Sequence, residues 1–154
     1  MEIKILDADS KDMEEILALQ KAAYRSEAKI YDDYSISPLH QTIEEIQNEF
    51  NNQLFIKGIK ENTVLGSVRG YEKNGTCFIG KLIVDPTYQN KGIGTKLLIE
   101  IENRFTHAQR FELFTGHKSS KNLHLYDKLG YKEFKRKNIS NKLTLIFLEK
   151  YNNS

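Results

Sequence analysis

The sequence predicts an α/β protein built on one mixed β-sheet of six or seven strands, with helices on both faces. The run Gly80–Val84 is mostly apolar and β-branched, as in a central strand that is covered on both sides. In Ile93–Phe105 apolar residues recur at helical spacing, and such a helix lets the strands on either side of it run parallel. The length of 154 residues suits a single domain, residues 1–154.

Two helices are expected between the first two strands. Glu2–Leu6 alternates polar and apolar residues, as a strand does. Ser10 can cap a first helix, and the segment 29–39, which contains a proline, is expected to be a loop. Thr42 and Glu45 then have the spacing of a capping box, which predicts the start of a second helix.

Three strands should follow in quick succession, at residues 54–59, 64–71 and 77–84. Asn74-Gly75 is a strong signal for a tight hairpin turn between the last two. Because these connections are short, the three strands are expected to be antiparallel neighbours. Beyond the helix at 93–105, the pattern predicts a strand at 111–115, a helix at 119–129 ended by Gly130, and strands at 131–134 and 143–148.

The loop between the strand ending at Val84 and the helix starting at Ile93 suits a phosphate group. A helix N-terminus carries unpaired N–H groups and a partial positive charge, glycines allow close approach, and Lys91 adds a full charge. The order of residues does not fit a Walker A loop, and position 97 is leucine where a dinucleotide fingerprint needs glycine. The alternative interpretation is a glycine-rich turn that only caps a structural helix.

Gln-x-x-Gly-x-Gly, directly after a strand that ends in Val-Asp-Pro, resembles the acetyl-CoA signature of the GCN5-related N-acetyltransferase (GNAT) family. A second stretch, from Asn122 to Tyr131, reads Asn-x-x-Leu-Tyr-x-x-Leu-Gly-Tyr and resembles the helix after the fifth strand in the same family. Asn122 and Tyr126 are four residues apart, so they share one face of that helix. Without the first motif, these two residues would simply be polar groups on an exposed face.

The resemblance implies an acetyl-CoA-dependent N-acetyltransferase, which passes the acetyl group directly to a primary amine of a small molecule or peptide in a ternary complex. Tyr126 would protonate the departing coenzyme A sulfur. The residues implied in binding the coenzyme are Leu82, Ile83, Val84, Gln89, Asn90, Lys91, Gly92, Ile93, Gly94, Thr95 and Asn122. Acetyl-CoA is the expected cosubstrate. No metal is expected, because the four histidines and one cysteine show no ligand spacing.

The sequence does not identify a general base. Members of the family often carry an acidic residue on the strand before the phosphate loop, but Phe78–Lys81 contains none. Glu72, Tyr71 and His117 are candidates, and so is water. Cys77 could carry an acetyl group, although a cysteine in an apolar strand is usually part of the core.

Two other functions compete with an enzyme. A catalytically inactive acyl-CoA-binding or sensor module of the same fold would keep the phosphate-binding loop but would not transfer the acetyl group. A nucleic-acid-binding domain could use the basic residues between Lys118 and Lys137, but 23 basic and 21 acidic residues leave a net charge of only +2. We therefore expect no nucleic-acid partner.

The expected surroundings of the protein follow from composition. No apolar run approaches the length of a membrane span, so no membrane partner is expected. A single cysteine excludes an internal disulfide and favours the cytoplasm. The resemblance also allows a homodimer. The segment 29–39, with Asp32 and Asp33, is a candidate contact for a cationic amine, or else a solvated loop.

Overall fold

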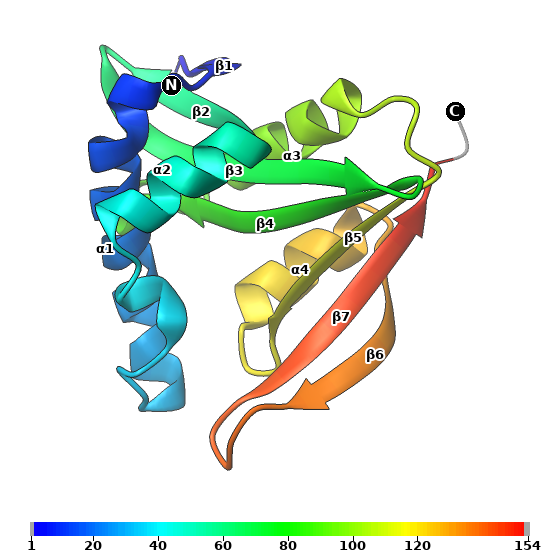
Figure 1. Cartoon of the computed structure of the whole chain (residues 1–154). Coiled ribbons are helices and arrows are strands. Elements are labelled where there is room, and N and C mark those ends of the chain that lie inside the picture. Colours follow the sequence, from blue (N-terminus) through cyan, green and yellow to red (C-terminus); the bar gives the residue numbers. More distant parts are fainter. Residues whose placement is uncertain (1, 153–154) are drawn as a thin grey trace.

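The structure is a computed structural model that describes residues 2–152, and it shows one open seven-stranded sheet with helices on both faces (Figure 1). The strands lie in the order β1-β2-β3-β4-β5-β7-β6. They are β1 Lys4–Asp7, β2 Leu54–Lys60, β3 Thr63–Lys73, β4 Thr76–Val84, β5 Arg110–Gly116, β6 Lys132–Asn138 and β7 Thr144–Tyr151. The α-helices are α1 Met13–Tyr31, α2 Ile43–Asn52, α3 Ile93–Arg104 and α4 Ser120–Lys128. The predicted fold class and element order are confirmed.

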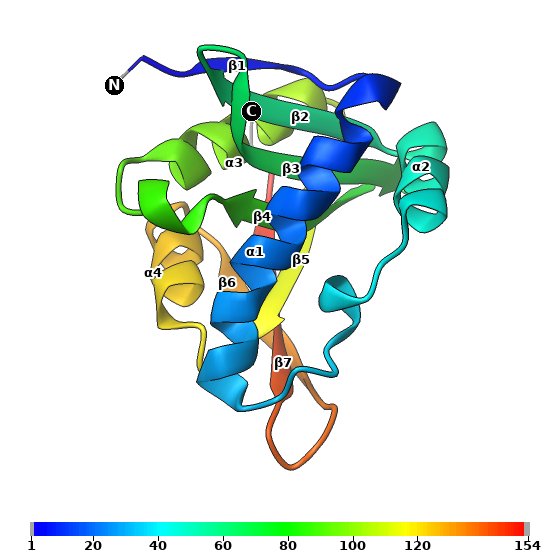
Figure 2. The same ribbon diagram turned by 90° about the vertical axis from the view of Figure 1, so that its left-hand side faces the viewer.

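A hydrophobic cluster on each face attaches the helices to the sheet. On one face, Leu97 of α3 and Tyr126 of α4 are buried in the same cluster. On the other face, Met13 of α1 and Ile46 of α2 are buried against β2, β3 and β4. Figure 2 shows α1 lying across the strands, with α3 behind the sheet. Burying one such aliphatic side chain stabilises the fold by about 1.5–3 kcal/mol, so the two clusters define the layers.

Local sequence signals set several boundaries as expected. Asn74 and Gly75 both have left-handed backbones, with φ of 53° and 84°, and they join β3 to β4 in a tight hairpin. Thr42 and Glu45 form the capping box of α2. Gly130 follows α4 with φ of 96°, a conformation that a glycine adopts at little cost.

Both ends of α1 differ from the sequence-based prediction. Asp9, rather than Ser10, provides the cap, and a 3-10 turn at Ser10–Asp12 leads into the helix. The expected loop at 29–39 begins only at Asp32, because α1 continues through Tyr31. Tyr31 is buried, and its hydroxyl lies 2.8 Å from Ser119 Oγ. This tertiary contact extends the helix by one turn.

β4 and β5 are the parallel pair of the sheet, and they separate soon after they meet. Their register covers only three pairs, Thr76–Phe78 with Arg110–Glu112. Beyond these pairs the two strands form a V, with its open end toward the start of α3 (Figure 1). The other neighbouring strands pair antiparallel. None of the helices within residues 2–152 is long and apolar enough to cross a membrane.

Gly66 should be required for the packing of α3 on β3. A Cβ at this position would lie 2.8 Å from Leu97 Cδ1 and 3.0 Å from the Ile83 carbonyl oxygen. We therefore expect Gly66→Ala to destabilise the fold by about 1–3 kcal/mol, as overpacked cores do. Gly80→Ala is the matched control, since its Cβ would meet only Arg69 Cγ, at 4.0 Å. Chemical denaturation measures both free energies of unfolding, and equal losses in the two variants would contradict the packing argument.

Candidate active site

The segment between β4 and α3 places an unusually bare helix start at the open end of the V. Gly92 is the N-cap of α3 with φ of 83°, no side chain caps the first turn, and that turn contains no acidic residue. Its N–H groups and the helix dipole therefore face the loop without a built-in anion. Lys91 is exposed beside it, and Asn90 has a left-handed backbone with φ of 64°. This arrangement suits a phosphate group.

The predicted main-chain contacts lie on the part of β4 that β5 has left. On the β3 side, Ile83 pairs with Ser67 and Val84 with Gly66. On the β5 side, the register ends at Phe78, so no strand within residues 2–152 pairs with Leu82, Ile83 or Val84 there. An extended ligand could pair with this edge as an additional strand would.

α4 brings the motif Asn122–Tyr131 next to the predicted phosphate cradle, Gln89–Thr95. A Cβ on Gly94 would lie 3.4 Å from Leu125 Cδ2, so the first turn of α3 packs directly against α4. Tyr126 is only 4% exposed. Burial raises the pKa of Tyr126 above its ordinary value of 10.0, and the nearby Tyr24 and Glu27 raise it further. The phenol therefore keeps its proton at neutral pH and can act as a donor.

Glu27 of α1 also belongs to this site, although the sequence analysis did not single it out. Its Oε2 accepts a hydrogen bond from Ser119 Oγ at 2.9 Å, and its Oε1 accepts one from Asn122 Nδ2 at 3.3 Å. Asn122 Nδ2 also lies 3.2 Å from Thr115 Oγ1 on β5. Burial raises the pKa of Glu27 above 4.5, and the bond from Ser119 opposes part of that rise.

A sequence signal for Glu27 was present. Gln20, Tyr24, Glu27 and Tyr31 recur at helical spacing on the face of α1 that is turned to the sheet. Polar groups on an inner face need partners, so such a series indicates a polar interior. Tyr24 shows this directly, because burial raises its pKa to about 12, with Arg69 lowering it and Glu27 raising it.

The C-terminal end of α1 is fixed to the start of α4 by Tyr31. Its hydroxyl accepts the Lys118 N–H at 2.8 Å and lies 2.8 Å from Ser119 Oγ. This approach requires glycine at position 116, because a Cβ there would overlap the Tyr31 hydroxyl. In the middle of the helix, α1 contacts β3 through Gln20, which accepts a hydrogen bond from Arg69 at 2.7 Å. α1 thus bridges the two arms of the V, as Figure 2 shows.

Other residues considered in the sequence analysis have different surroundings. His117 Nδ1 accepts the Thr144 backbone N–H at 3.0 Å, so it is held by the chain. Tyr71 stacks on Phe78, with ring centroids 5.4 Å apart, and Glu72 is exposed. Cys77 is buried, and burial raises its pKa to about 12, so its thiol is not activated.

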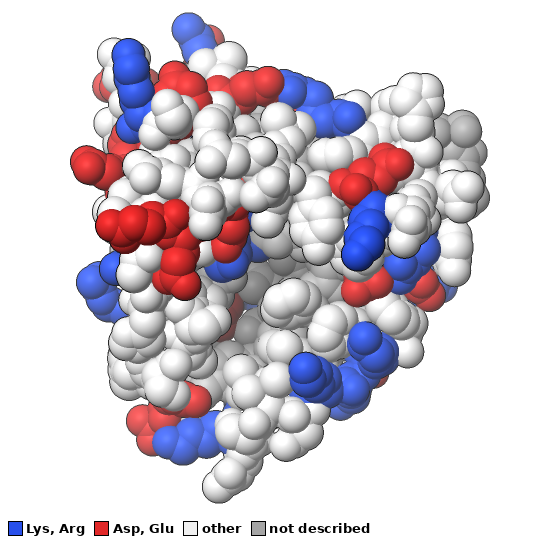
Figure 3. Space-filling view, viewed as in Figure 1, with Lys and Arg blue, Asp and Glu red and all other residues white. Residues whose placement is uncertain are grey.

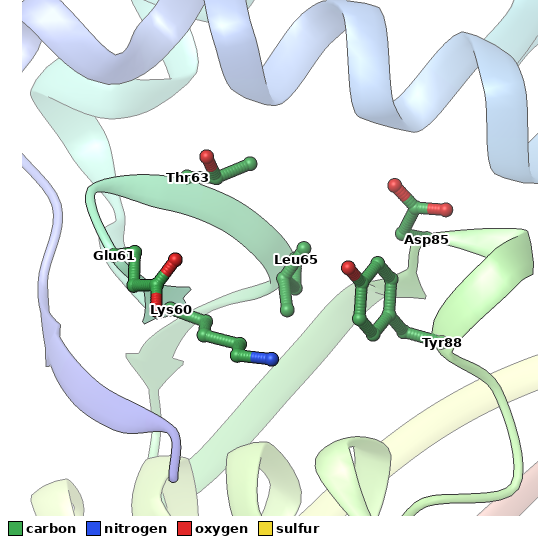
Figure 4. Close-up of a pocket in the computed structure, with 6 residues that line it drawn as sticks. All are labelled: Lys60, Glu61, Thr63, Leu65, Asp85 and Tyr88. Carbon is green, nitrogen blue, oxygen red and sulfur yellow. The ribbon is translucent and has the colours of Figure 1, made fainter. Parts of the chain in front are cut away.

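Hollows occur on both sides of β4. Figure 3 shows a hollow in the middle of the molecule, between α1 with α2 and the strands β5, β7 and β6. A separate pocket of about 200 Å³ lies on the β3 side of the strand end, lined by Lys60, Glu61, Thr63, Leu65, Asp85 and Tyr88 (Figure 4). Because β3 and β5 flank β4 on opposite sides, this pocket is not part of the V.

A split parallel strand pair, with a bare helix start and a buried tyrosine at its open end, is the arrangement expected of an acyl-CoA-dependent transferase. Residues 13–131 match the acetyltransferase (GNAT) family, and the chain belongs to this family. Family membership supports acyl transfer from acetyl-CoA in general. Tyr126, the loop Gln89–Thr95 and the strand residues Leu82–Val84 all fall within the matched segment.

The chain is also similar to a curated protein and to solved structures of acetyltransferases. UPF0157 protein YqkA of Bacillus subtilis is 31% identical over 120 residues, which are 77% of this chain but only 34% of that protein. The PaiA N-acetyltransferase of Thermoplasma acidophilum, solved in complex with coenzyme A, has a TM-score of 0.82 at 19% identity, covering 98% of this chain and 99% of its own. The ribosomal-protein-S18-alanine N-acetyltransferase of Escherichia coli has a TM-score of 0.82 at 14% identity, with coverages of 99% and 96%. At these identities the two solved structures establish the fold.

Glu27 should titrate above pH 4.5, and Ser119→Ala should raise its pKa further by removing a hydrogen bond to the carboxylate. The folded protein then holds this proton more tightly than the unfolded chain does. The stabilisation from Glu27 is fully present below about pH 4.5 and is lost as the pH rises through the folded pKa. Carboxyl-carbon NMR titration measures the pKa.

Glu45 provides an internal reference in the same titration, because hydrogen bonds from Thr42 lower its pKa below 4.5. Its titration should not respond to Ser119→Ala, which lies on a different helix. A Glu27 that titrates together with Glu45 would show that the carboxyl group is solvated, and would remove it from the site.

Proposed function

We propose that this protein is an acetyl-CoA-dependent N-acetyltransferase that passes the acetyl group directly to a primary amine of a small molecule or peptide. The observation that carries this proposal is the separation of β4 from β5 after three residue pairs. It leaves an unpaired strand edge that ends at the bare start of α3. Family membership supports the acyl donor, and the coenzyme A bound to the Thermoplasma neighbour supports the choice of cosubstrate.

The residues present fit acetyl-CoA. The pantetheine would pair with the main chain of Leu82–Val84, and the pyrophosphate would lie on the N–H groups and charge of Gln89–Thr95. Asn122 lies on α4 between Thr115 of β5 and Glu27 of α1. We also propose that these residues take the roles stated here and that the reaction uses no metal.

Amide formation needs a neutral amine, a stabilised oxyanion and a leaving thiol. An alkyl amine has a pKa near ~10.4, so a base must remove a proton before attack. We assign this role to Glu27, because its half-buried carboxylate has a raised pKa and faces the interior of the site. The amine nitrogen then attacks the thioester carbonyl, and a β4 backbone N–H stabilises the oxyanion.

Tyr126 would assist the departure of the sulfur. The thiol of coenzyme A has a pKa of roughly 8.5 on the cysteine reference, well below that of the buried phenol. Complete transfer of the Tyr126 proton to the thiolate is therefore uphill. Its main contribution would be a hydrogen bond to the developing negative charge. Of the two protons that the alkylammonium loses, Glu27 takes the first before attack and releases it to solvent. The second leaves the nitrogen after attack and ends on the thiolate as the thiol forms.

Cys77, the single cysteine of the chain, supports the proposal of transfer without an acetyl-enzyme. Its thiol is buried with a pKa of about 12, so thiolate is scarce at neutral pH. We also propose that the chain is one acetyltransferase domain and that it works in the cytoplasm, where an unpaired cysteine is usual.

The proposal includes a homodimer as a possible assembly. The exposed aromatic residues Phe114 of β5 and Phe134 of β6 would be available for its interface.

Charge reversal in the cradle should weaken coenzyme A binding without unfolding the protein. Lys91 is exposed, so Lys91→Glu should leave the thermal midpoint unchanged. Placing a negative charge next to the pyrophosphate should lower the affinity by about tenfold or more. Isothermal titration calorimetry measures the affinity, with Lys11→Glu as the control on a distant exposed turn. Equal affinities in both variants would place the pyrophosphate elsewhere.

Removing the hydroxyl of Tyr126 should slow the chemical step. Tyr126→Phe keeps the ring in its buried position, so folding and coenzyme binding should be preserved. Loss of a hydrogen-bond donor that acts mainly in the transition state typically lowers the rate by about 10²–10³-fold, and the effect should appear in kcat rather than KM. A screen of amines with acetyl-CoA, followed by thiol release, identifies an acceptor, and single-turnover rates then compare the variant with the wild type.

Tyr131→Phe is the control for that comparison, because this buried tyrosine donates its hydroxyl to Glu102 in the core. A rate for Tyr126→Phe equal to that of the wild type would make Tyr126 a packing residue. Coenzyme A binding without thiol release for any amine would favour the alternative, a catalytically inactive acyl-CoA-binding module.

A further inference from the structure

Lys81 occupies a strained position in the middle of β4. Its φ is 45°, in the left-handed region that residues other than glycine seldom adopt. The pairing with β3 shifts register here, between Ser67 and Arg69, so β4 carries an extra residue. Strain of this kind costs about 1–3 kcal/mol and persists where the surrounding structure requires it. The bulge directs Lys81 toward α2, where its Nζ lies 3.9 Å from Glu49 Oε1.

Glu49 cannot fully balance this charge, because other groups already bind its carboxylate. Its Oε1 accepts a hydrogen bond from Arg69 Nη1 at 2.6 Å, and its Oε2 accepts one from Gln41 Nε2 at 2.5 Å. Arg69 and Lys81 together carry two positive charges against one negative charge. Burial and the charge of Arg69 lower the pKa of Lys81, while Glu49 opposes them. Arg69 and Glu49 are the two charged groups that act on Lys81, and they leave an excess positive charge.

Room for a ligand adjoins this excess charge. Gly80, directly before Lys81, has so much space that an added Cβ would meet only Arg69 Cγ, at 4.0 Å. The side chain of Lys81 is 26% exposed, so Lys81 is not sealed in the core. Ser67 Oγ and Arg69 Nε on β3 are buried without a hydrogen-bond partner among residues 2–152. The sheet face under α1 thus carries unmet donors as well as an unbalanced cation.

We propose that the acceptor is an amine that also carries a carboxylate, which Lys81 binds. This inference rests on the proposed transfer reaction and names the substrate class for the same site. Gln20 lies over Arg69, and Glu27 follows it two turns later on α1, about 10 Å along the helix axis. Because Arg69 shares Glu49 with Lys81, the base and the cation lie at different points along α1, as an acceptor with an amine at one end and a carboxylate at the other requires.

Matched acceptors test this class directly. Wild-type protein is given acetyl-CoA and either an amino acid, the corresponding amino-acid amide or the decarboxylated amine, and kcat/KM is obtained from thiol release. A charge-assisted contact is worth about 10- to 100-fold, so the amino acid should exceed its amide by at least about tenfold. Lys81→Gln should reduce this ratio to near one, whereas Lys81→Arg, which keeps the charge in the same backbone conformation, should largely preserve it.

Lys11→Gln, on the distant 3-10 turn, should preserve the ratio and controls for a general loss of positive charge. Calorimetry with coenzyme A verifies that each variant is folded and loaded. Equal use of amino acid and amide by the wild type, or a preference that survives in Lys81→Gln, overturns the proposal while leaving the transferase function intact. Absence of thiol release with every amine overturns both.

Discussion

The early separation of β4 from β5 is the constraint on which the site depends. Parallel strands need a crossover between them, and α3 provides it, so its N-terminus necessarily lies at the end of β4. Where the strands part, β4 keeps one unpaired edge, and backbone groups there need water or a ligand. The split does not divide the core, because α3 and α4 contribute to one hydrophobic cluster beneath both arms. A stable layer thus supports an open strand edge.

α1 provides the polar counterpart on the opposite face. Gln20 contacts Arg69 on β3, the strand next to one arm of the V, and Tyr31 contacts Ser119 beside the other arm. A buried arginine is expensive to desolvate, and the salt bridge to Glu49 with the amide groups of Gln20 and Gln41 offsets this only in part. Such a network contributes less to stability than to fixing where α1 crosses the sheet. Glu27 is held against α4 by the same crossing.

The sequence was sufficient for the order of the elements, the parallel pair and the start of α3, because each depends on local patterns such as Asn74-Gly75 or the glycine at the N-cap of α3. It was not sufficient for Glu27, whose contact with Ser119 joins residues 92 positions apart. The extra turn of α1 depends in the same way on a distant glycine, Gly116. The left-handed conformation of Lys81 could not be predicted either, because lysine has no preference for it and the register with β3 imposes it.

The residues proposed to bind the coenzyme and the helices on the opposite side of the site come from different parts of the chain, and this has an evolutionary consequence. The cradle, the strand edge and Tyr126 come from a continuous segment between Leu82 and Tyr126. In contrast, α1 and α2, which lie on the other side of the hollow seen in Figure 3, precede β2. Under the proposed function, mutations in the first third of the chain would reshape the wall opposite the coenzyme, and only those at Glu27 would reach a proposed coenzyme residue directly, through Asn122. Duplicated copies of such a gene could then diverge in acceptor while retaining one common donor.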